Sequence, residues 1–231
     1  MNADQILYED NHLIVLNKQA GQIVQGDKTG DTCMAEEIKA FLKVRDSKPG
    51  NVFCGVVHRL DRPVSGVCIF AKTSKALSRM NELVKSRQFH KTYWAITKPE
   101  DARIPMDMEK HHLEDHLLRN EKQNKSYVVK TGNKEAKLAS LDYQLLAVSK
   151  GGYRLVEVEL HTGRHHQIRC QLSHQGLPIK GDLKYGAPRS NPDGSISLHA
   201  RKVEFEHPVS HQHILIEAPC PKEFNLMLDI N

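Results

Sequence analysis

A polar break between two apolar segments constrains the fold more than any other stretch of this chain. Residues 52–57 and 67–71 are apolar and rich in strand-forming side chains, which predicts two buried strands. Between them lies His58-Arg59-Leu60-Asp61-Arg62-Pro63-Val64-Ser65-Gly66, a polar turn with one carboxylate between two arginines. We expect the two guanidinium groups to keep Asp61 ionised even where water is partly excluded. A carboxylate held between two rigid strands is well placed for catalysis. The alternative is that Asp61 has a structural role and forms an ion pair with an arginine that caps the turn.

Short segments of strand length recur along the rest of the chain. We expect strands at residues 6–8, 12–18, 91–97, 138–147, 153–160, 197–205 and 213–218. The spacing of apolar residues predicts helices at residues 32–44, 73–84 and 166–174. Asp31 is the expected N-cap of the first helix, and Thr73 or Ser74 that of the second. Residues 98–136 are polar and look irregular, with a short strand near residues 127–129.

Strands therefore outnumber helices, and several are joined by hairpin turns. This pattern favours an α+β fold with a mixed, largely antiparallel sheet flanked by helices and loops. The 231 residues suffice for one large domain or two closely packed lobes, and no linker or repeat divides them. We expect one domain over residues 1–231.

Composition narrows the class of protein. Lys and Arg number 33 against 28 Asp and Glu, a net charge of +5 that allows a nucleic-acid partner without requiring one. The sequence has no apolar run of the roughly 20 residues that a membrane-spanning helix needs, and its polar N-terminus does not resemble a secretory signal. The five cysteines are irregularly spaced, which argues against a disulfide framework or a zinc ribbon. We expect a cytoplasmic protein without a membrane partner.

The 14 histidines raise the question of a metal site. They cluster at His111-His112-x-x-x-His116 and at His161-x-x-x-His165-His166. His112 and His116 would share one face of a helix, but no Glu directly follows the first His, so the zincin motif is absent. We interpret these histidines as solvent-facing or bound to the backbone, and we expect no metal.

Other polar clusters are separated along the chain. Residues 160–169 run from a strand through Gly163 to the start of a helix, where backbone N–H groups suit a phosphate. Arg164, Gln167 and Arg169 offer donors for phosphates, carboxylates or base edges. Lys91-x-Tyr93 lies on a strand, and a glycine-rich loop follows at residues 176–186.

Together these motifs resemble those of the RluA-type pseudouridine synthase family, which isomerises uridine in structured RNA. The resemblance covers nearly the whole chain. It rests on the Asp61 turn, Leu160-x-Thr162-Gly163-Arg164-x-His166-Gln167-Ile168-Arg169, Gly176-x-Pro178-Ile179-x-Gly181-Asp182-x-x-Tyr185-Gly186, Leu198-His199-Ala200 with His207-Pro208, residues 6–10 and Asn17-Lys18-Gln19-Ala20-Gly21. Val64 stands where the family usually has Thr, and Gln19 where it usually has Pro. Both departures lie outside the charged residues of the motifs.

The resemblance implies a pseudouridine synthase catalytic domain with a cleft across its sheet, and a reaction without metal or organic cofactor. Asp61 would attack either ribose C1′ or uracil C6, Arg169 would pair with Asp61, and Tyr93 would stack on the uracil and assist proton removal. The target base must be flipped out of its stack, and Arg59 would fill the gap unless it only contacts a phosphate. Tyr93 would otherwise be an ordinary aromatic residue on a strand. The remaining expected RNA contacts or positioning residues are Lys18, Arg62, Lys91, Arg164 and Gln167.

The implied substrate is a stem-loop of ribosomal or transfer RNA. The motifs begin near residue 6, which leaves no room for the S4-type module of many family members, so recognition is expected from the catalytic domain and from insertions such as residues 100–136. We expect a monomer with no obligate protein partner.

Two functions other than uridine isomerisation are possible for a chain with these motifs. One is an RNA-binding or RNA-folding factor without catalysis, which the joint presence of Asp61, Tyr93 and Arg169 disfavours. The other is a hydrolase that uses Asp61 on a glycosidic bond, but no motif supplies the second carboxylate that such enzymes use.

Overall fold

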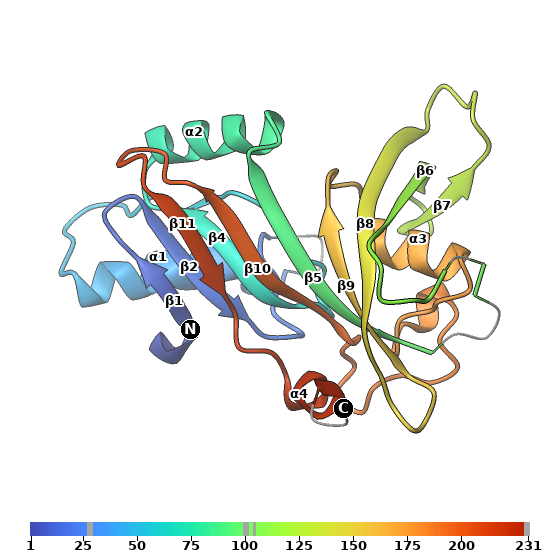
Figure 1. Cartoon of the computed structure of the whole chain (residues 1–231). Coiled ribbons are helices and arrows are strands. Elements are labelled where there is room, and N and C mark those ends of the chain that lie inside the picture. Colours follow the sequence, from blue (N-terminus) through green and yellow to red (C-terminus); the bar gives the residue numbers. More distant parts are fainter. Residues whose placement is uncertain (27–29, 99–101, 104, 229–231) are drawn as a thin grey trace. The chain divides into compact units, whose positions relative to one another are not determined.

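The computed structural model describes residues 1–26, 30–98, 102–103 and 105–228 (Figure 1). The chain folds into two compact units. The first comprises Met1–His90 and Ala200–Pro219, and the second comprises Lys91–His199 and Cys220–Asn231. Both combine a mostly antiparallel sheet with α-helices, so the predicted α+β class is confirmed.

In the first unit, the strand after the Asp61 turn lies in the middle of a sheet. The order is β1 (Ile6–Glu9), β2 (Leu13–Lys18), β4 (Ser65–Ala71), β10 (Leu198–Glu206) and β11 (His213–Glu217), with the short β3 (Gly55–Val56) also on β4. Every residue of β4 is buried, as expected for a central strand with apolar side chains on both faces.

Two helices accompany this sheet (Figure 1). The helix α2 (Ser74–Lys85) packs Ala76 and Met80 against apolar residues of β2, β4 and β10, and the Oγ1 of its N-cap Thr73 accepts a bond from Ala76 N, as predicted. The helix α1 (Met34–Arg45) begins two residues later than expected. Asp31 does not cap it, because its carboxylate binds Arg62, and Cys33 occupies the N-cap without a side-chain bond.

In the second unit, five antiparallel strands follow the order β5 (Phe89–Thr97), β9 (Arg154–Leu160), β8 (Lys137–Val148), β6 (His111–Asn120) and β7 (Lys125–Val129). Two helices complete it. The helix α3 (Gln167–His174) contributes Cys170 to a cluster with Leu117 and Ala139, and α4 (Lys222–Leu228) adds Phe224 and Met227 to a second cluster.

The stretch at residues 98–136 differs from the prediction. It holds a ten-residue strand, β6, paired with β7 on one side and β8 on the other. His112 and His116 therefore lie on a strand, and their placement on one helix face was wrong. Only Leu113 and Leu117 of β6 are buried, a spacing of four that does not reveal the strand period. The helix α4 was not predicted, and the strand expected over residues 52–57 is confined to β3.

Candidate active site

The Asp61 turn is fixed by a buried lysine. Lys18, at the end of β2, is fully buried, and its Nζ donates to the carbonyl oxygens of Gln19 (3.1 Å), Arg62 (3.1 Å) and Val64 (2.6 Å). Two backbone bonds complete the arrangement, from Gly21 N to Arg62 O (2.8 Å) and from Val64 N to Asp61 O (3.0 Å). The ammonium group of Lys18 thus holds the turn against the end of β2.

Lys18 also provides positive charge close to Asp61. Burial lowers the pKa of Lys18 to about 8, and the nearby Asp61 carboxylate opposes this shift. Asp61 itself is half-buried, whereas Arg59 and Arg62 are exposed. The two arginines thus extend into water, whereas the Asp61 carboxylate has only limited access to solvent.

Gly66 seats the far end of the turn against another strand. Its φ is +117°, and a Cβ at this position would lie 2.3 Å from the carbonyl oxygen of Ala200 on β10. Only glycine fits such an approach of two backbones. The turn is therefore anchored on β2 at one end and on β10 at the other.

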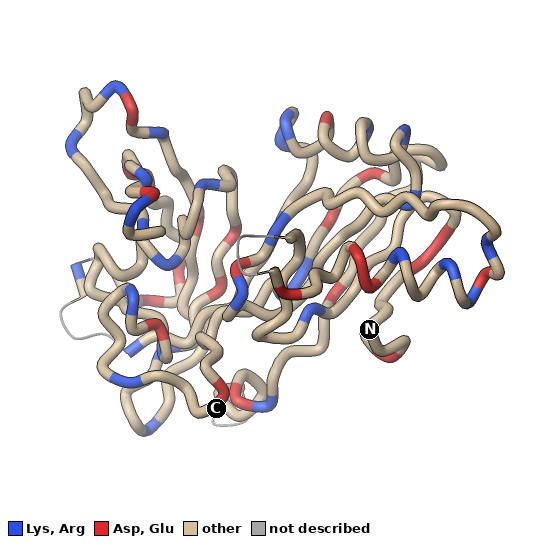
Figure 2. Tube along the Cα trace, turned by 180° about the vertical axis from the view of Figure 1, so that it is seen from behind, with Lys and Arg blue, Asp and Glu red and all other residues tan. Residues whose placement is uncertain are grey.

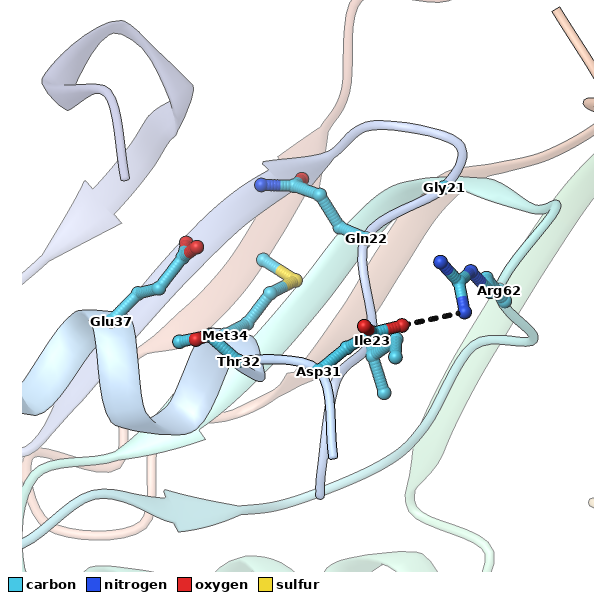
Figure 3. A pocket seen from close by; sticks show the side chains of 8 residues that line it. All are labelled: Gly21, Gln22, Ile23, Asp31, Thr32, Met34, Glu37 and Arg62. Carbon is cyan, nitrogen blue, oxygen red and sulfur yellow. Dashed lines mark hydrogen bonds and ion pairs between the residues drawn. The ribbon is translucent and has the colours of Figure 1, made fainter. Parts of the chain in front are cut away.

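A pocket of about 200 Å³ lies beside the turn, on the side of Arg62 (Figure 3). Arg62 Nη1 lies 2.9 Å from Asp31 Oδ2 across this pocket, and both side chains are about half exposed, so water screens the pair. The other lining residues are Gly21, Gln22, Ile23, Thr32, Met34 and Glu37. Asp61 does not line this pocket, which is therefore not centred on the carboxylate.

In the second unit, β5 carries Lys91 and Tyr93 opposite Leu160 and Val158 of β9. Tyr93 is 7% exposed. A Cβ built on Gly163 would lie 3.5 Å from Lys91 Nζ, so this amine lies over the glycine turn, and burial lowers its pKa. The structure thus brings the strand motif and the glycine turn together.

Gln167 organises the turn that leads into α3. Its Oε1 accepts bonds from Thr162 Oγ1 (2.7 Å) and Arg164 N (3.0 Å), and its Nε2 donates to Ser140 O (3.1 Å). Arg164 Nε donates to Leu138 O (2.8 Å), and the residue is exposed. The Gln167 amide is thus engaged within the protein.

Arg169 is held by a partner that sequence reasoning missed. It is 5% exposed, and its Nε and Nη2 donate to Asp182 Oδ2 (2.7 Å) and Oδ1 (2.9 Å) in a bidentate pair. Its Cζ also lies 5.1 Å from the centre of the Tyr185 ring. Gly181 permits this arrangement, because a Cβ there would approach Ser195 O to 2.7 Å. The Gly-Asp pair of the glycine-rich loop was the signal that could have identified Asp182.

The predicted site residues therefore form two groups. Lys18, Arg59, Asp61 and Arg62 belong to the first unit. The second unit holds Lys91, Tyr93, Arg164, Gln167 and Arg169. No helix within the described ranges is long and apolar enough to cross a membrane.

Comparison with known proteins connects both groups to one family. A family model described as RNA pseudouridylate synthase matches residues 12–174. The chain is 32% identical over 247 residues to an uncharacterized RNA pseudouridine synthase of Chlorobaculum parvum, covering 97% of this chain and 73% of the relative. It is 31% identical to ribosomal large subunit pseudouridine synthase D of Xanthomonas campestris, with coverages of 96% and 68%. For tRNA pseudouridine synthase C of Salmonella typhi the identity is 32%, with coverages of 93% and 84%.

A solved structure agrees with this relationship. Human RNA pseudouridylate synthase domain containing 4 superimposes with a TM-score of 0.78 at 25% identity, over 98% of this chain and 92% of that one. The matched family model includes the Asp61 turn, the Tyr93 strand and the segment that carries Arg164, Gln167 and Arg169. The chain therefore belongs to the RluA family of RNA pseudouridine synthases and is an isomerase.

Proposed function

We propose that this enzyme converts a uridine in a stem-loop of ribosomal or transfer RNA to pseudouridine, with Asp61 as the nucleophile. The observation that carries the proposal is the anchoring of the Asp61 turn by Lys18 and Gly66. A half-buried carboxylate on such a rigid turn is suited to attack a substrate at one fixed position.

The reaction balances without an added reactant. In the route through C1′, a carboxylate oxygen of Asp61 bonds to C1′ while the C1′–N1 bond breaks and uracil leaves as an anion. The uracil turns, its C5 bonds to C1′, and the carboxylate is released. The C5 proton then passes to a base and N1 gains a proton. Addition of Asp61 to uracil C6 is the alternative first step.

The second unit supplies the other proposed catalytic groups. Tyr93 stacks on the uracil and assists removal of the C5 proton. Arg169 pairs with the Asp61 carboxylate, and its orientation is set by the bidentate bonds to Asp182. We propose that residues 1–231 act as one catalytic domain.

The remaining residues divide by exposure. Arg59, Arg62 and Arg164 are exposed, so we assign Arg59 to the gap left by the flipped uridine and the other two to the RNA backbone. Lys18 and Gln167 are buried and bonded within the protein, so we assign them positioning roles. Lys91, which lies over Gly163, is the proposed contact to a phosphate at that turn.

Both RNA classes remain as targets. Relatives named for the large ribosomal subunit and for tRNA are 31% and 32% identical to this chain.

We further propose a monomer without an obligate protein partner. The cysteines Cys33, Cys54, Cys68 and Cys170 are buried free thiols, which supports the proposal of a reducing cytoplasm.

Substitution of the carboxylate tests the catalytic assignment. Asp61→Asn keeps the shape of the side chain but removes the nucleophile, so we expect no pseudouridine formation, with RNA affinity within about tenfold of the wild type. Asp4→Asn is the matched control, because it removes an exposed carboxylate of the same unit that lies outside the proposed site. Turnover by Asp61→Asn on a confirmed substrate would overturn the proposal.

Mapping identifies the target. Pseudouridines are compared across the transcriptome in a strain that lacks the gene and in the same strain restored with wild type or Asp61→Asn. A site that returns only with the wild type identifies the RNA and its class. A phenotype restored equally by both proteins would favour the RNA-folding factor instead.

A further inference from the structure

Three side chains from neighbouring strands converge on one face of the second unit. His112 lies on β6 directly opposite Asp142 on β8, and His161 follows the last residue of β9. His112 Nδ1 lies 2.7 Å from one carboxylate oxygen of Asp142, and His161 Nε2 lies 3.0 Å from the other. The three groups thus offer two ring nitrogens and one carboxylate within 4.8 Å of one another.

We propose that His112, Asp142 and His161 form a binding site for one divalent transition-metal ion. The site is separate from the residues that we assign to the reaction, and it does not depend on those assignments. Within the described ranges, no other group of three His, Cys, Asp or Glu side chains comes as close together.

The backbone around this site is already fixed. Asp142 pairs with His112 on one side and with Glu159 of β9 on the other, so strand register holds two of the three ligands in place. Zinc ligands lie about 2.0–2.2 Å from the ion, which places them closer together than 4.8 Å. The histidine side chains are 56% and 38% exposed, so their rings can rotate inward without disturbing the core.

The surrounding charges favour a cation. Asp142, Glu159 and Glu157 are carboxylates on this part of the sheet, and Lys110 is the cation that their charges act on. Lys110 Nζ is 2.8 Å from Glu159, and Glu157 accepts a bond from Trp94 Nε1 (3.0 Å). Three carboxylates against one ammonium leave the region negative, which disfavours a phosphate there.

The ligand types select the class of ion. Two imidazoles and one carboxylate suit Zn²⁺, Co²⁺ or Ni²⁺, whereas Mg²⁺ and Ca²⁺ prefer all-oxygen ligands. Three protein ligands leave at least one position for water. A bound ion would link β6, β8 and β9 just before the glycine turn at Gly163, and it would therefore stabilise the second unit.

Cobalt provides a direct probe of this proposal. The full chain without a histidine tag is titrated with CoCl₂ and followed by visible absorption, and the bound cobalt is then displaced with ZnCl₂. We expect one equivalent of Co²⁺ to bind with nitrogen and oxygen ligands, Zn²⁺ to compete, and excess MgCl₂ to have no effect. His112→Gln and His161→Gln should each weaken the affinity at least about tenfold.

Matched controls separate the site from incidental binding by the other histidines. His211 is exposed and pairs with Glu206 at 2.6 Å, outside the three-residue cluster, so His211→Gln should bind cobalt as the wild type does. ZnCl₂ should raise the unfolding temperature of the wild type and of His211→Gln, but not of the two site variants. Metal-free urea curves establish that all variants are folded.

Two outcomes would overturn the proposal. One is the absence of stoichiometric cobalt binding by the wild type. The other is equal affinity in the wild type, His112→Gln and His161→Gln. Neither readout involves uridine, so failure here leaves the assignment of Asp61 unaffected.

Discussion

Lys18 illustrates at the scale of a residue how the Asp61 turn is built. Taking an ammonium group out of water costs free energy, and here three carbonyl oxygens at 2.6 to 3.1 Å offset that cost. Two of these oxygens belong to Arg62 and Val64, which follow the carboxylate in the chain. The position of Asp61 thus depends on a side chain 43 residues earlier in the chain.

Replacing Lys18 tests this dependence. Lys18→Met keeps the length of the side chain but leaves the buried carbonyls without a donor, so we expect the free energy of unfolding to fall by about 2–4 kcal/mol. We also expect the rate of pseudouridine formation at saturating RNA to fall at least about tenfold, because the turn is no longer held. Urea unfolding and single-turnover kinetics measure the two effects.

Lys39→Met is the control for this experiment. Lys39 binds Glu36 on the same helix and is 37% exposed, so its loss should change stability by less than about 0.5 kcal/mol. A folded Lys18→Met with the wild-type rate would contradict the positioning role.

Asp182 plays a comparable role for Arg169. Both side chains of this pair are buried, so removing one charge leaves the other uncompensated. We expect Asp182→Asn to lower kcat by about 10- to 100-fold while KM for RNA changes less than about threefold, because the guanidinium loses its orientation but not its presence. Steady-state kinetics at a temperature where circular dichroism shows the variant folded provide the measurement.

Asp107→Asn is the matched substitution for this pair. Asp107 is exposed and binds His111 on the same unit, so its kinetics should equal those of the wild type. A change in KM alone in Asp182→Asn would indicate that Arg169 contributes to binding rather than to the chemical step.

Sequence reasoning identifies the residues of the site better than their partners. The polar break between two apolar runs predicts the Asp61 turn, and the structure has a turn there. The acceptors of Lys18 are main-chain carbonyls, which every residue has, so no pattern distinguishes them. The pairing of Arg169 with Asp182 depends on how the loop after α3 folds back, a non-local feature.

At the scale of elements, Glu9 joins three parts of the first unit. It lies at the end of β1, and its carboxylate binds Arg45 at the end of α1 (2.7 Å) and Lys72 directly after β4 (2.6 Å). The hydrogen bonds from Arg45 contribute most to lowering the pKa of Glu9 to about 2. A side chain that is 17% exposed thus links a helix to the edge of the sheet.

The lowered pKa of Glu9 predicts a pH dependence of stability. Its contribution is complete above the ordinary value of 4.5 and is lost as the pH falls toward about 2, because the unfolded chain takes up the proton first. We expect Glu9→Gln to be about 1–3 kcal/mol less stable than the wild type at pH 7, with a smaller difference at pH 3. Urea unfolding at pH 7, 5 and 3 measures it.

Glu36→Gln serves as the control, since Glu36 forms an exposed pair on α1. Its difference from the wild type should be small at every pH. A constant difference for Glu9→Gln over the whole range would show that the carboxylate is not coupled to folding.

Elements with strong periodicity were predictable, and those that depend on distant partners were not. The helix α2 has both a cap residue and a clear apolar face, and it agrees with the prediction within a residue. The strand β6 has few buried side chains and is defined by backbone pairing with β7 and β8. The short helix α4 depends on burying Phe224 and Met227, which the local sequence does not indicate.

At the scale of the molecule, charge is spread over both units and the two signs are interspersed (Figure 2). A basic excess occurs at residues 119–137, which include the turn between β6 and β7 and the connection to β8. The cations there are Arg119, Lys122, Lys125, Lys130, Lys134 and Lys137, against Glu121 and Glu135. This segment is suited to contact a phosphate backbone.

Charge reversal tests that contact. Lys122 and Lys134 are exposed, so the double change Lys122→Glu with Lys134→Glu should weaken RNA binding at least about tenfold at low salt. The slope of log affinity against log salt should also fall by about 2, because two phosphate contacts are lost. Filter binding over a range of KCl concentrations gives both quantities.

The same charge change elsewhere provides the control. Lys75→Glu with Lys85→Glu alters exposed lysines on α2, so any general effect of net charge appears in both proteins. Equal losses in the two double variants would assign the effect to net charge rather than to residues 119–137.

The discontinuous path of the first unit has a consequence for biosynthesis. Its sheet needs β10 and β11, which leave the ribosome more than a hundred residues after β4, whereas most of the second unit is one continuous stretch. Domains generally fold as their segments emerge, so the second unit can mature on the nascent chain first. Gly66 meets Ala200 only after residues 67–199 have been synthesised. The Asp61 turn is thus synthesised well before β10, the strand against which its far end is seated, and it reaches its final form only after that strand has emerged.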